Sequence, residues 1–137
     1  MHRTLINQAI REANKVDFKY RLGAIIFKNK TRIISTGHNH GNRFRRNLKP
    51  KYTRWIGSLH AEVDAILNTK ENLHNMQMLV IRIDKSGGFR LAKPCEEHCM
   101  KYIENVGLKR VYYSIDNDNF GIIERRNFGN SDKIIEI

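Results

Sequence analysis

Two apolar segments with a helical segment between them constrain the fold of this 137-residue chain most strongly. The segment MQMLVIRID (76–84) is apolar enough for a buried strand, and KRVYYSI (109–115) is typical of a second strand. Between them, the residues from Cys95 to about Val106 predict a helix that ends at Gly107. A strand, a helix and a strand with short connections predict a parallel crossover, the unit from which α/β folds are built.

The other segments fit around this unit. The runs RLGAIIFKN (21–29) and TRIISTGHN (31–39) predict a hairpin, and FGIIERR (120–126) predicts an edge strand before a frayed end. Apolar residues at helical spacing, from Ile6 to Val16, predict an N-terminal helix, and SLHAEVDAILNTK (58–70) predicts another with Ser58 as its N-cap. These elements indicate an α/β architecture with a mixed sheet and helices on its faces. The length predicts one domain over residues 1–137.

The positive charge is unevenly distributed. The net charge is +11, and residues 1–60 carry 14 Lys and Arg against 2 acids, whereas residues 61–137 carry 11 against 12. The basic loop GNRFRRNLKPKYTRW (41–55) holds six cations, three aromatic residues and no acid. A one-sided positive charge indicates an anionic partner, and cations interleaved with aromatic residues are typical of single-strand binding surfaces.

The location of the protein is predicted from what the sequence lacks. No apolar run is long enough to span a bilayer, and the first residues have no secretory apolar region. Only two cysteines are present, Cys95 and Cys99. We therefore expect a cytoplasmic protein with no membrane partner, in which the thiols serve a metal or catalysis and not a disulfide.

Two short motifs carry candidate chemistry. HAE places His60 and Glu62 at the start of one helix, and PCEEHC places Cys95 and Cys99 at the start of another. A catalytic zinc ion takes three protein ligands with N and S atoms, and helix N-termini favour the thiolate form of cysteine. Glu62 would lie close enough to move a proton beside the metal without ligating it. The spacing allows two ligand sets, because His98 could replace Cys99.

The ordered set of an H-x-E helix start, a strand, a P-C helix start and a strand resembles the zinc-dependent cytidine and deoxycytidylate deaminase superfamily. The resemblance runs from about Arg21 to Ser114 and is reinforced by GAIIF, STGHN and GLKRVYYS. Because the first ligand position is a histidine, the chain is most similar to the deoxycytidylate, tRNA adenosine and polynucleotide cytosine deaminases. The resemblance implies a cytidine-deaminase-like three-layer sandwich, with a mixed five-stranded sheet and helices on both faces.

The motif departs from the family in one place, since the family has C-x-x-C and this chain has C-x-x-x-C. Matching Ile103 and Gly107 to the family's helix and helix end puts Cys99 at the second thiol. The resemblance therefore implies one catalytic Zn²⁺ held by His60, Cys95 and Cys99, with His98 as a neighbour.

The resemblance also implies roles around the metal. Glu62 would be the catalytic proton carrier, and Asn39, the Ala61 backbone N–H and Tyr113 would contact the substrate. Arg45 and Arg46 of the basic loop would bind phosphate. His38 and His40 are interpreted as bystanders in a loop.

The implied activity is deamination of cytosine to uracil in a phosphorylated substrate, either a dCMP-type nucleotide or a single-stranded polynucleotide. The alternatives are a tRNA-type adenosine deaminase and a non-catalytic zinc-stabilised nucleic-acid-binding module. The expected partner is thus a cytosine nucleotide or single-stranded nucleic acid, and a homo-oligomer is compatible with the sequence.

Overall fold

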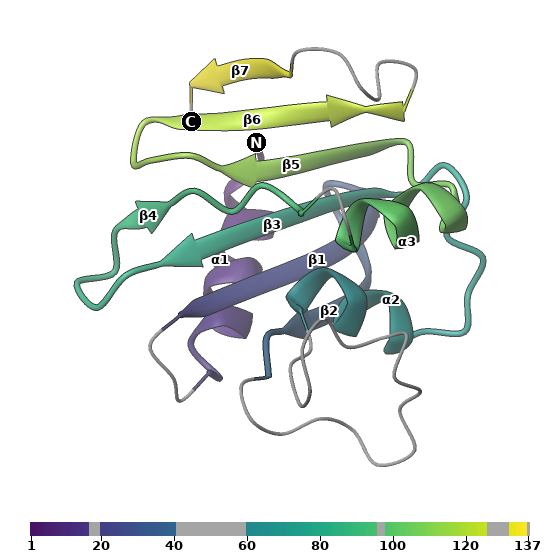
Figure 1. Cartoon of the computed structure of the whole chain (residues 1–137), viewed down its shortest axis with the longest axis horizontal. Coiled ribbons are helices and arrows are strands. Elements are labelled where there is room, and N and C mark those ends of the chain that lie inside the picture. The colour runs from purple at the N-terminus through teal and green to yellow at the C-terminus, as the bar shows by residue number, and fades with distance from the viewer. Residues whose placement is uncertain (17–19, 41–59, 96–97, 126–131, 137) are drawn as a thin grey trace.

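The computed structural model of the chain describes residues 1–16, 20–40, 60–95, 98–125 and 132–136. Within these ranges the helices are α1 (Arg3–Ala13), α2 (Ala61–Leu67) and α3 (Cys99–Val106). The strands are β1 (Arg21–Asn29), β2 (Arg32–His38), β3 (Gln77–Ile83), β4 (Phe89–Arg90), β5 (Arg110–Ser114), β6 (Asn119–Glu124) and β7 (Lys133–Glu136). They form one sheet in the order β2-β1-β3-β5-β6-β7, in which β4 also pairs with β3 (Figure 1).

The two strand pairs predicted from sequence are both present. β3 and β5 are parallel, with Val80 opposite Tyr113, and α3 lies in the connection between them. β1 and β2 form the predicted antiparallel hairpin, which closes where Asn29 pairs with Arg32. All other described strand pairs are antiparallel, so the sheet is mixed as predicted.

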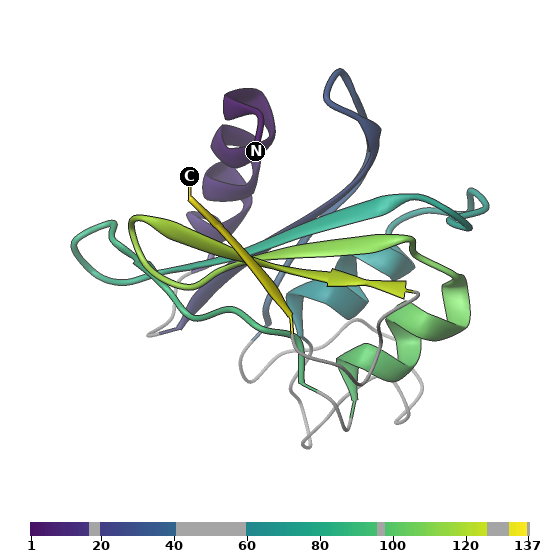
Figure 2. The same cartoon turned by 90° about the horizontal axis from the view of Figure 1, so that it is seen from above.

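Helices cover both faces of the sheet, which confirms the predicted three-layer sandwich (Figure 2). Alternate residues of a strand point to opposite faces, and β1 shows this clearly. Ile25 and Phe27 join the cluster under α1, whereas Ala24 and Ile26 join the cluster under α2 and α3. Each face of the sheet therefore has its own apolar core.

The sheet is larger than the five strands predicted, because the described residues alone form seven. The two additional strands are β4, with two residues, and β7, with four, and both are too short to show an alternating pattern. β6 is also not an edge strand as predicted, since β7 pairs with it and takes the edge.

The predicted helix boundaries need correction at three ends. α1 ends at Ala13, so Val16 is buried beyond the helix. α2 has His60 as its N-cap and not Ser58, which itself lies outside the described residues. α3 begins at Cys99, so Cys95 precedes the helix. The predicted end of α3 is confirmed by Gly107, whose φ of 77° is the left-handed conformation that favours glycine.

None of the described helices is long and apolar enough to cross a membrane.

Candidate active site

α2 is fixed against β2 by an unusually close approach of backbones. A Cβ atom added at Gly37 would lie 2.3 Å from the backbone N of Ala65, so only glycine lets the strand and the helix pack this closely. Ser35 Oγ donates a hydrogen bond to the Ala65 carbonyl at 2.7 Å, and Asn68 Nδ2 donates to the Thr36 carbonyl, also at 2.7 Å. These contacts position the N-terminus of α2, where His60 and Glu62 lie.

The segment that carries the thiols is fixed by the parallel strands. Ala92 N donates to the Ser114 carbonyl at 2.9 Å, and Ser114 Oγ donates to the Arg90 carbonyl at 2.6 Å. Cys95 follows this anchored stretch, and its sulfur accepts a hydrogen bond from the backbone N of Cys99 at 3.3 Å. The two cysteines therefore face each other at the start of α3.

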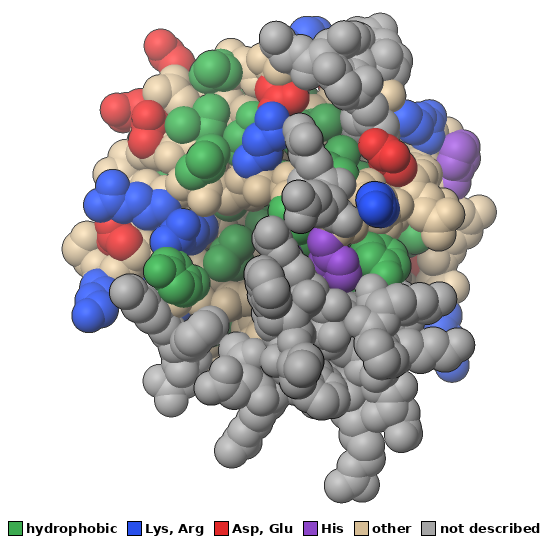
Figure 3. All heavy atoms as spheres, viewed as in Figure 1, with side chains coloured by type: hydrophobic (Ala, Val, Ile, Leu, Met, Phe, Trp, Pro, Cys, Tyr) green, Lys and Arg blue, Asp and Glu red, His purple; other side chains and the backbone are tan. Residues whose placement is uncertain are grey.

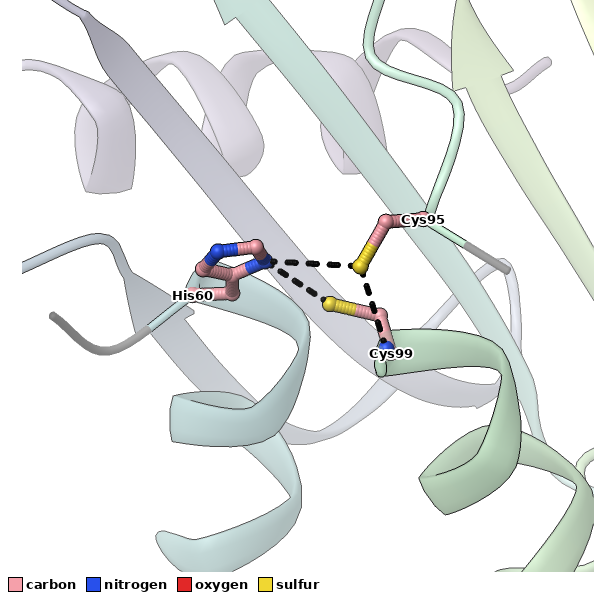
Figure 4. A group of neighbouring side chains, drawn as sticks. All are labelled: His60, Cys95 and Cys99. Carbon is pink, nitrogen blue, oxygen red and sulfur yellow. Dashed lines mark hydrogen bonds between the residues drawn. The ribbon is translucent and has the colours of Figure 1, made fainter. Parts of the chain in front are cut away.

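His60 meets both thiols. Its Nδ1 lies 3.0 Å from Cys99 Sγ and 3.8 Å from Cys95 Sγ, and the three ligand atoms all lie within 4.8 Å of one another (Figure 4). Tetrahedral zinc with bonds of about 2.0–2.1 Å to nitrogen and about 2.3 Å to sulfur separates such atoms by about 3.6 Å. The observed N–S separations bracket this value, so the three residues fit one Zn²⁺.

The electrostatics of the thiols also suit a cation. The Cys99 thiol and His60 donate hydrogen bonds to the Cys95 sulfur, which lowers the pKa of Cys95 to about 3. The pKa of Cys99 is raised, because in this pair Cys99 keeps the shared proton and is buried. The surroundings thus favour a thiolate at Cys95, and a bound cation would favour loss of the second proton.

Glu62 lies beside this cluster and is only 3% exposed. Burial raises the pKa of its carboxyl group above the usual 4.5. Its Oε1 is shielded from solvent and makes no hydrogen bond to any described residue. A buried carboxyl group with a raised pKa and an unused oxygen is suited to accept and release a proton.

His98 stands outside the ligand cluster that the described residues form. It is the N-cap of α3, and its ring packs edge-on against the rings of His60 and Tyr102, with centroids 5.5 Å and 5.3 Å away. Of the two ligand sets allowed by the spacing, the geometry therefore favours the one with Cys99.

The predicted substrate contacts differ in their surroundings. The Asn39 side chain accepts from Leu22 N at 2.8 Å and donates to the Tyr20 carbonyl at 2.7 Å, so it is tied to the start of β1. Ala61 is fully buried as the first residue of α2. The predicted phosphate contacts Arg45 and Arg46 lie outside the described residues, as does the rest of the basic loop.

Tyr113 is buried in the core beneath α2 and α3, and its hydroxyl donates to Asp132 Oδ2 at 2.5 Å. Lys93 Nζ lies 2.9 Å from the same carboxylate oxygen. This link could not be predicted from the sequence, because Asp132 lies in a tail whose pattern is weak. The contacts favour a structural role for Tyr113.

A partly buried His-Cys-Cys cluster beside a buried glutamate is typical of a catalytic mononuclear zinc site. Residues 1–115 match the family model for the cytidine and deoxycytidylate deaminase zinc-binding region. The chain belongs to this family, and it is a zinc-dependent hydrolytic deaminase. The match confirms the resemblance and extends it to the N-terminus.

Solved structures show the same fold at low identity. The apo dCMP deaminase of the cyanophage S-TIM5 is 24% identical with a TM-score of 0.54, over 82% of this chain and 84% of that one. The structure of that enzyme in complex with dCMP and dUMP is 22% identical, with a TM-score of 0.51 over 82% of each chain.

A third structure is the diaminohydroxyphosphoribosylaminopyrimidine deaminase/5-amino-6-(5-phosphoribosylamino)uracil reductase of Thermotoga maritima. It is 22% identical with a TM-score of 0.51, over 80% of this chain but only 28% of that one. No curated protein matched the chain.

Proposed function

We propose that the protein deaminates the cytosine base of a dCMP-type nucleotide to uracil, within one deaminase domain over residues 1–137. The observation that carries this proposal is the His60, Cys95 and Cys99 cluster with the buried Glu62 beside it. The family supports cytosine as the base. The S-TIM5 enzyme of the same fold, solved with dCMP and dUMP, supports a nucleotide as the substrate.

The chemistry is a hydrolysis, in which the C–N bond to the exocyclic amine breaks and a C–O bond to water forms. His60, Cys95 and Cys99 would hold the Zn²⁺ ion, which when bound would lower the pKa of a water molecule to about 7. Glu62 would take a proton from the attacking water and deliver it to the ring nitrogen beside the amino-bearing carbon. Glu62 then passes the second proton to the amine, which leaves as ammonia.

Other residues of the chain hold the base. The Ala61 N–H, at the start of α2, would donate to the carbonyl oxygen of the base, where the helix dipole favours negative charge. Asn39 would contact the sugar or the base, in an orientation fixed by its hydrogen bonds to the backbone. Arg45 and Arg46 would neutralise the 5′-phosphate.

A single-stranded polynucleotide is the second candidate, and the composition of the basic loop favours it. On the face drawn in Figure 3, the described residues do not form a basic patch that would support this candidate. There the Lys and Arg side chains of the described residues are scattered among acidic and apolar ones.

The test measures ammonia released from dCMP, CMP, deoxycytidine, single-stranded DNA, RNA and tRNA. We expect turnover of dCMP, and a loss of about 10²–10⁴-fold in kcat for Glu62→Gln with zinc content unchanged. Release of ammonia from tRNA adenosine would overturn the proposal in favour of an adenosine deaminase. If the zinc-loaded protein releases ammonia from none of these substrates, the protein is a non-catalytic module.

The basic loop distinguishes the two cytosine substrates. Replacing Arg45, Arg46 and Lys49 together by Ser should raise KM for dCMP and leave deoxycytidine unaffected. If the substrate is a polymer, the same change should instead reduce the salt dependence of single-strand binding, by about 0.7 in log–log slope for each phosphate that the variant no longer neutralises.

A further inference from the structure

A second cluster of metal-ligating side chains lies at the other side of α2. The cluster consists of His38, His40 and Asp64, each of which offers one ligand atom. These three atoms lie within 4.8 Å of one another. His38 ends β2, His40 follows two residues later, and Asp64 lies in α2 and is 1% exposed. Since residues two apart on a helix do not share a face, Asp64 points away from Glu62 and this cluster is separate from the catalytic one.

Glu12 of α1 contacts this cluster from the other face of the sheet. Its Oε1 lies 3.3 Å from His38 Nδ1, and it is 3% exposed. Its other oxygen pairs with Lys15 Nζ at 2.7 Å, which leaves Oε1 directed at the histidine. The edge strand β2 has α1 on one face and α2 on the other (Figure 2). Carboxylates from both helices therefore contact the histidines at its end.

The separations are long for hydrogen bonds and are close to those between the ligands of one metal ion. His40 Nε2 lies 3.3 Å from Asp64 Oδ2, yet it is shielded from solvent and makes no hydrogen bond within the described ranges. A direct N–H···O bond would be about 2.9 Å long, whereas nitrogen and oxygen ligands of tetrahedral zinc lie about 3.4 Å apart. The His38–Glu12 separation has the same value of 3.3 Å.

The surroundings also hold the ligands in place. The backbone N of His38 donates to Asp64 Oδ2 at 3.1 Å, and Asn68 Nδ2 lies 3.4 Å from the same oxygen. The rings of His38 and His40 pack together with centroids 4.6 Å apart. Such supporting contacts orient ligating side chains in metal sites.

We propose that His38, His40 and Asp64 bind a second divalent transition-metal ion, with Glu12 orienting the His38 ring through Nδ1. Two imidazoles with a carboxylate suit zinc, iron, cobalt or nickel, and the absence of thiolates from these three residues separates the site chemically from the catalytic one. The ion would join β2 and α2, and so would hold the helix that carries His60 and Glu62.

The test is metal stoichiometry on the purified full chain after equilibration with Zn²⁺ and removal of free ion. We expect about two ions per chain for the wild type and about one for His40→Gln, whose side chain is 27% exposed and so tolerates the change. The control His2→Asn removes a histidine elsewhere, keeps an N-cap for α1 and should retain both ions.

Cobalt distinguishes the two sites within one sample. Thiolate-to-cobalt charge-transfer absorption arises only at the His60, Cys95 and Cys99 site, so the second equivalent of Co²⁺ should bind without increasing it. Asp64→Asn should abolish the binding of this second equivalent of Co²⁺ and leave the thiolate absorption intact. Saturation at one ion per chain, or retention of two ions by His40→Gln, would show that the cluster is only a pair of histidine–carboxylate contacts.

Discussion

Replacing Gly37 by Ala should damage the active site without touching a catalytic residue. The new Cβ would lie 2.3 Å from Ala65 N and 2.8 Å from the Ala61 carbonyl, both in α2. Ordinary contact begins at 3.4 Å, so α2 must retreat by about 1 Å. β2 cannot yield in its place, because Gly37 is paired with Ala24 of β1.

Two magnitudes follow from this displacement. Overpacking costs about 1–3 kcal/mol, which for a chain of this length lowers Tm by about 4–12 °C. A shift of about 1 Å in a catalytic group can cost about 10²-fold in rate. His60 and Glu62 move with α2, whereas Cys95 and Cys99 lie at α3, so we expect kcat and zinc affinity to fall together.

Gly23→Ala is the matched control. Its Cβ would lie 2.2 Å from the Ala9 carbonyl in α1, on the opposite face of the sheet, so the overpacking is comparable but leaves His60, Cys95 and Cys99 in place. Tm by calorimetry, zinc content and kcat on dCMP are measured for both variants below their Tm. The reasoning is refuted if Gly37→Ala loses stability but keeps kcat within about threefold of the wild type, or if both variants lose activity equally.

Three further predictions concern single side chains. Cys99→Ala should lose the catalytic zinc and His98→Ala should keep it; metal analysis giving the reverse would reassign the third ligand. Burial raises the pKa of Glu62 in the folded state above that in the unfolded chain. In the metal-free protein, the contribution of Glu62 to stability is therefore fully present below pH 4.5 and is lost as the pH rises through the folded-state pKa. Metal-free Glu62→Gln should therefore have a higher Tm than the wild type near pH 8, with the difference closing toward pH 4.5; a pH-independent difference would contradict this. Tyr113→Phe loses the bond to Asp132 and should lower stability by about 1 kcal/mol by denaturant titration. A large loss of kcat at unchanged stability would restore its predicted role beside the base.

Long, regular segments were predictable from the sequence. The hairpin of β1 and β2 and the parallel pair of β3 and β5 each have strands of five or more residues with a clear pattern. β4 and β7 form through pairing with a neighbour already in place, and their own residues carry too little pattern to reveal them. The candidate ligands were identified through the family motif, because spacing alone allowed either His98 or Cys99 as the third ligand.

The second cluster could not be predicted, because its three residues and Glu12 lie on three elements far apart in the sequence. His38 and His40 were interpreted as bystanders in a loop, yet His38 belongs to β2 and both face buried carboxylates. The signal available was a pair of histidines two apart at a strand end. This pair indicates a metal site only once the packing of α1 and α2 is known to place Glu12 and Asp64 beside it.

The separation of the catalytic ligands along the chain has a consequence for refolding. Cys95, His98 and Cys99 are close neighbours in sequence, whereas His60 is 39 residues from Cys99. An unfolded chain therefore already offers zinc a local trio of donors, and metal bound there lowers the net stabilisation that the native site provides. If zinc is present during refolding, His60 must displace His98 before the site is complete. Refolding in chelator and adding zinc afterwards avoids that exchange, and we expect it to give the higher yield of active protein.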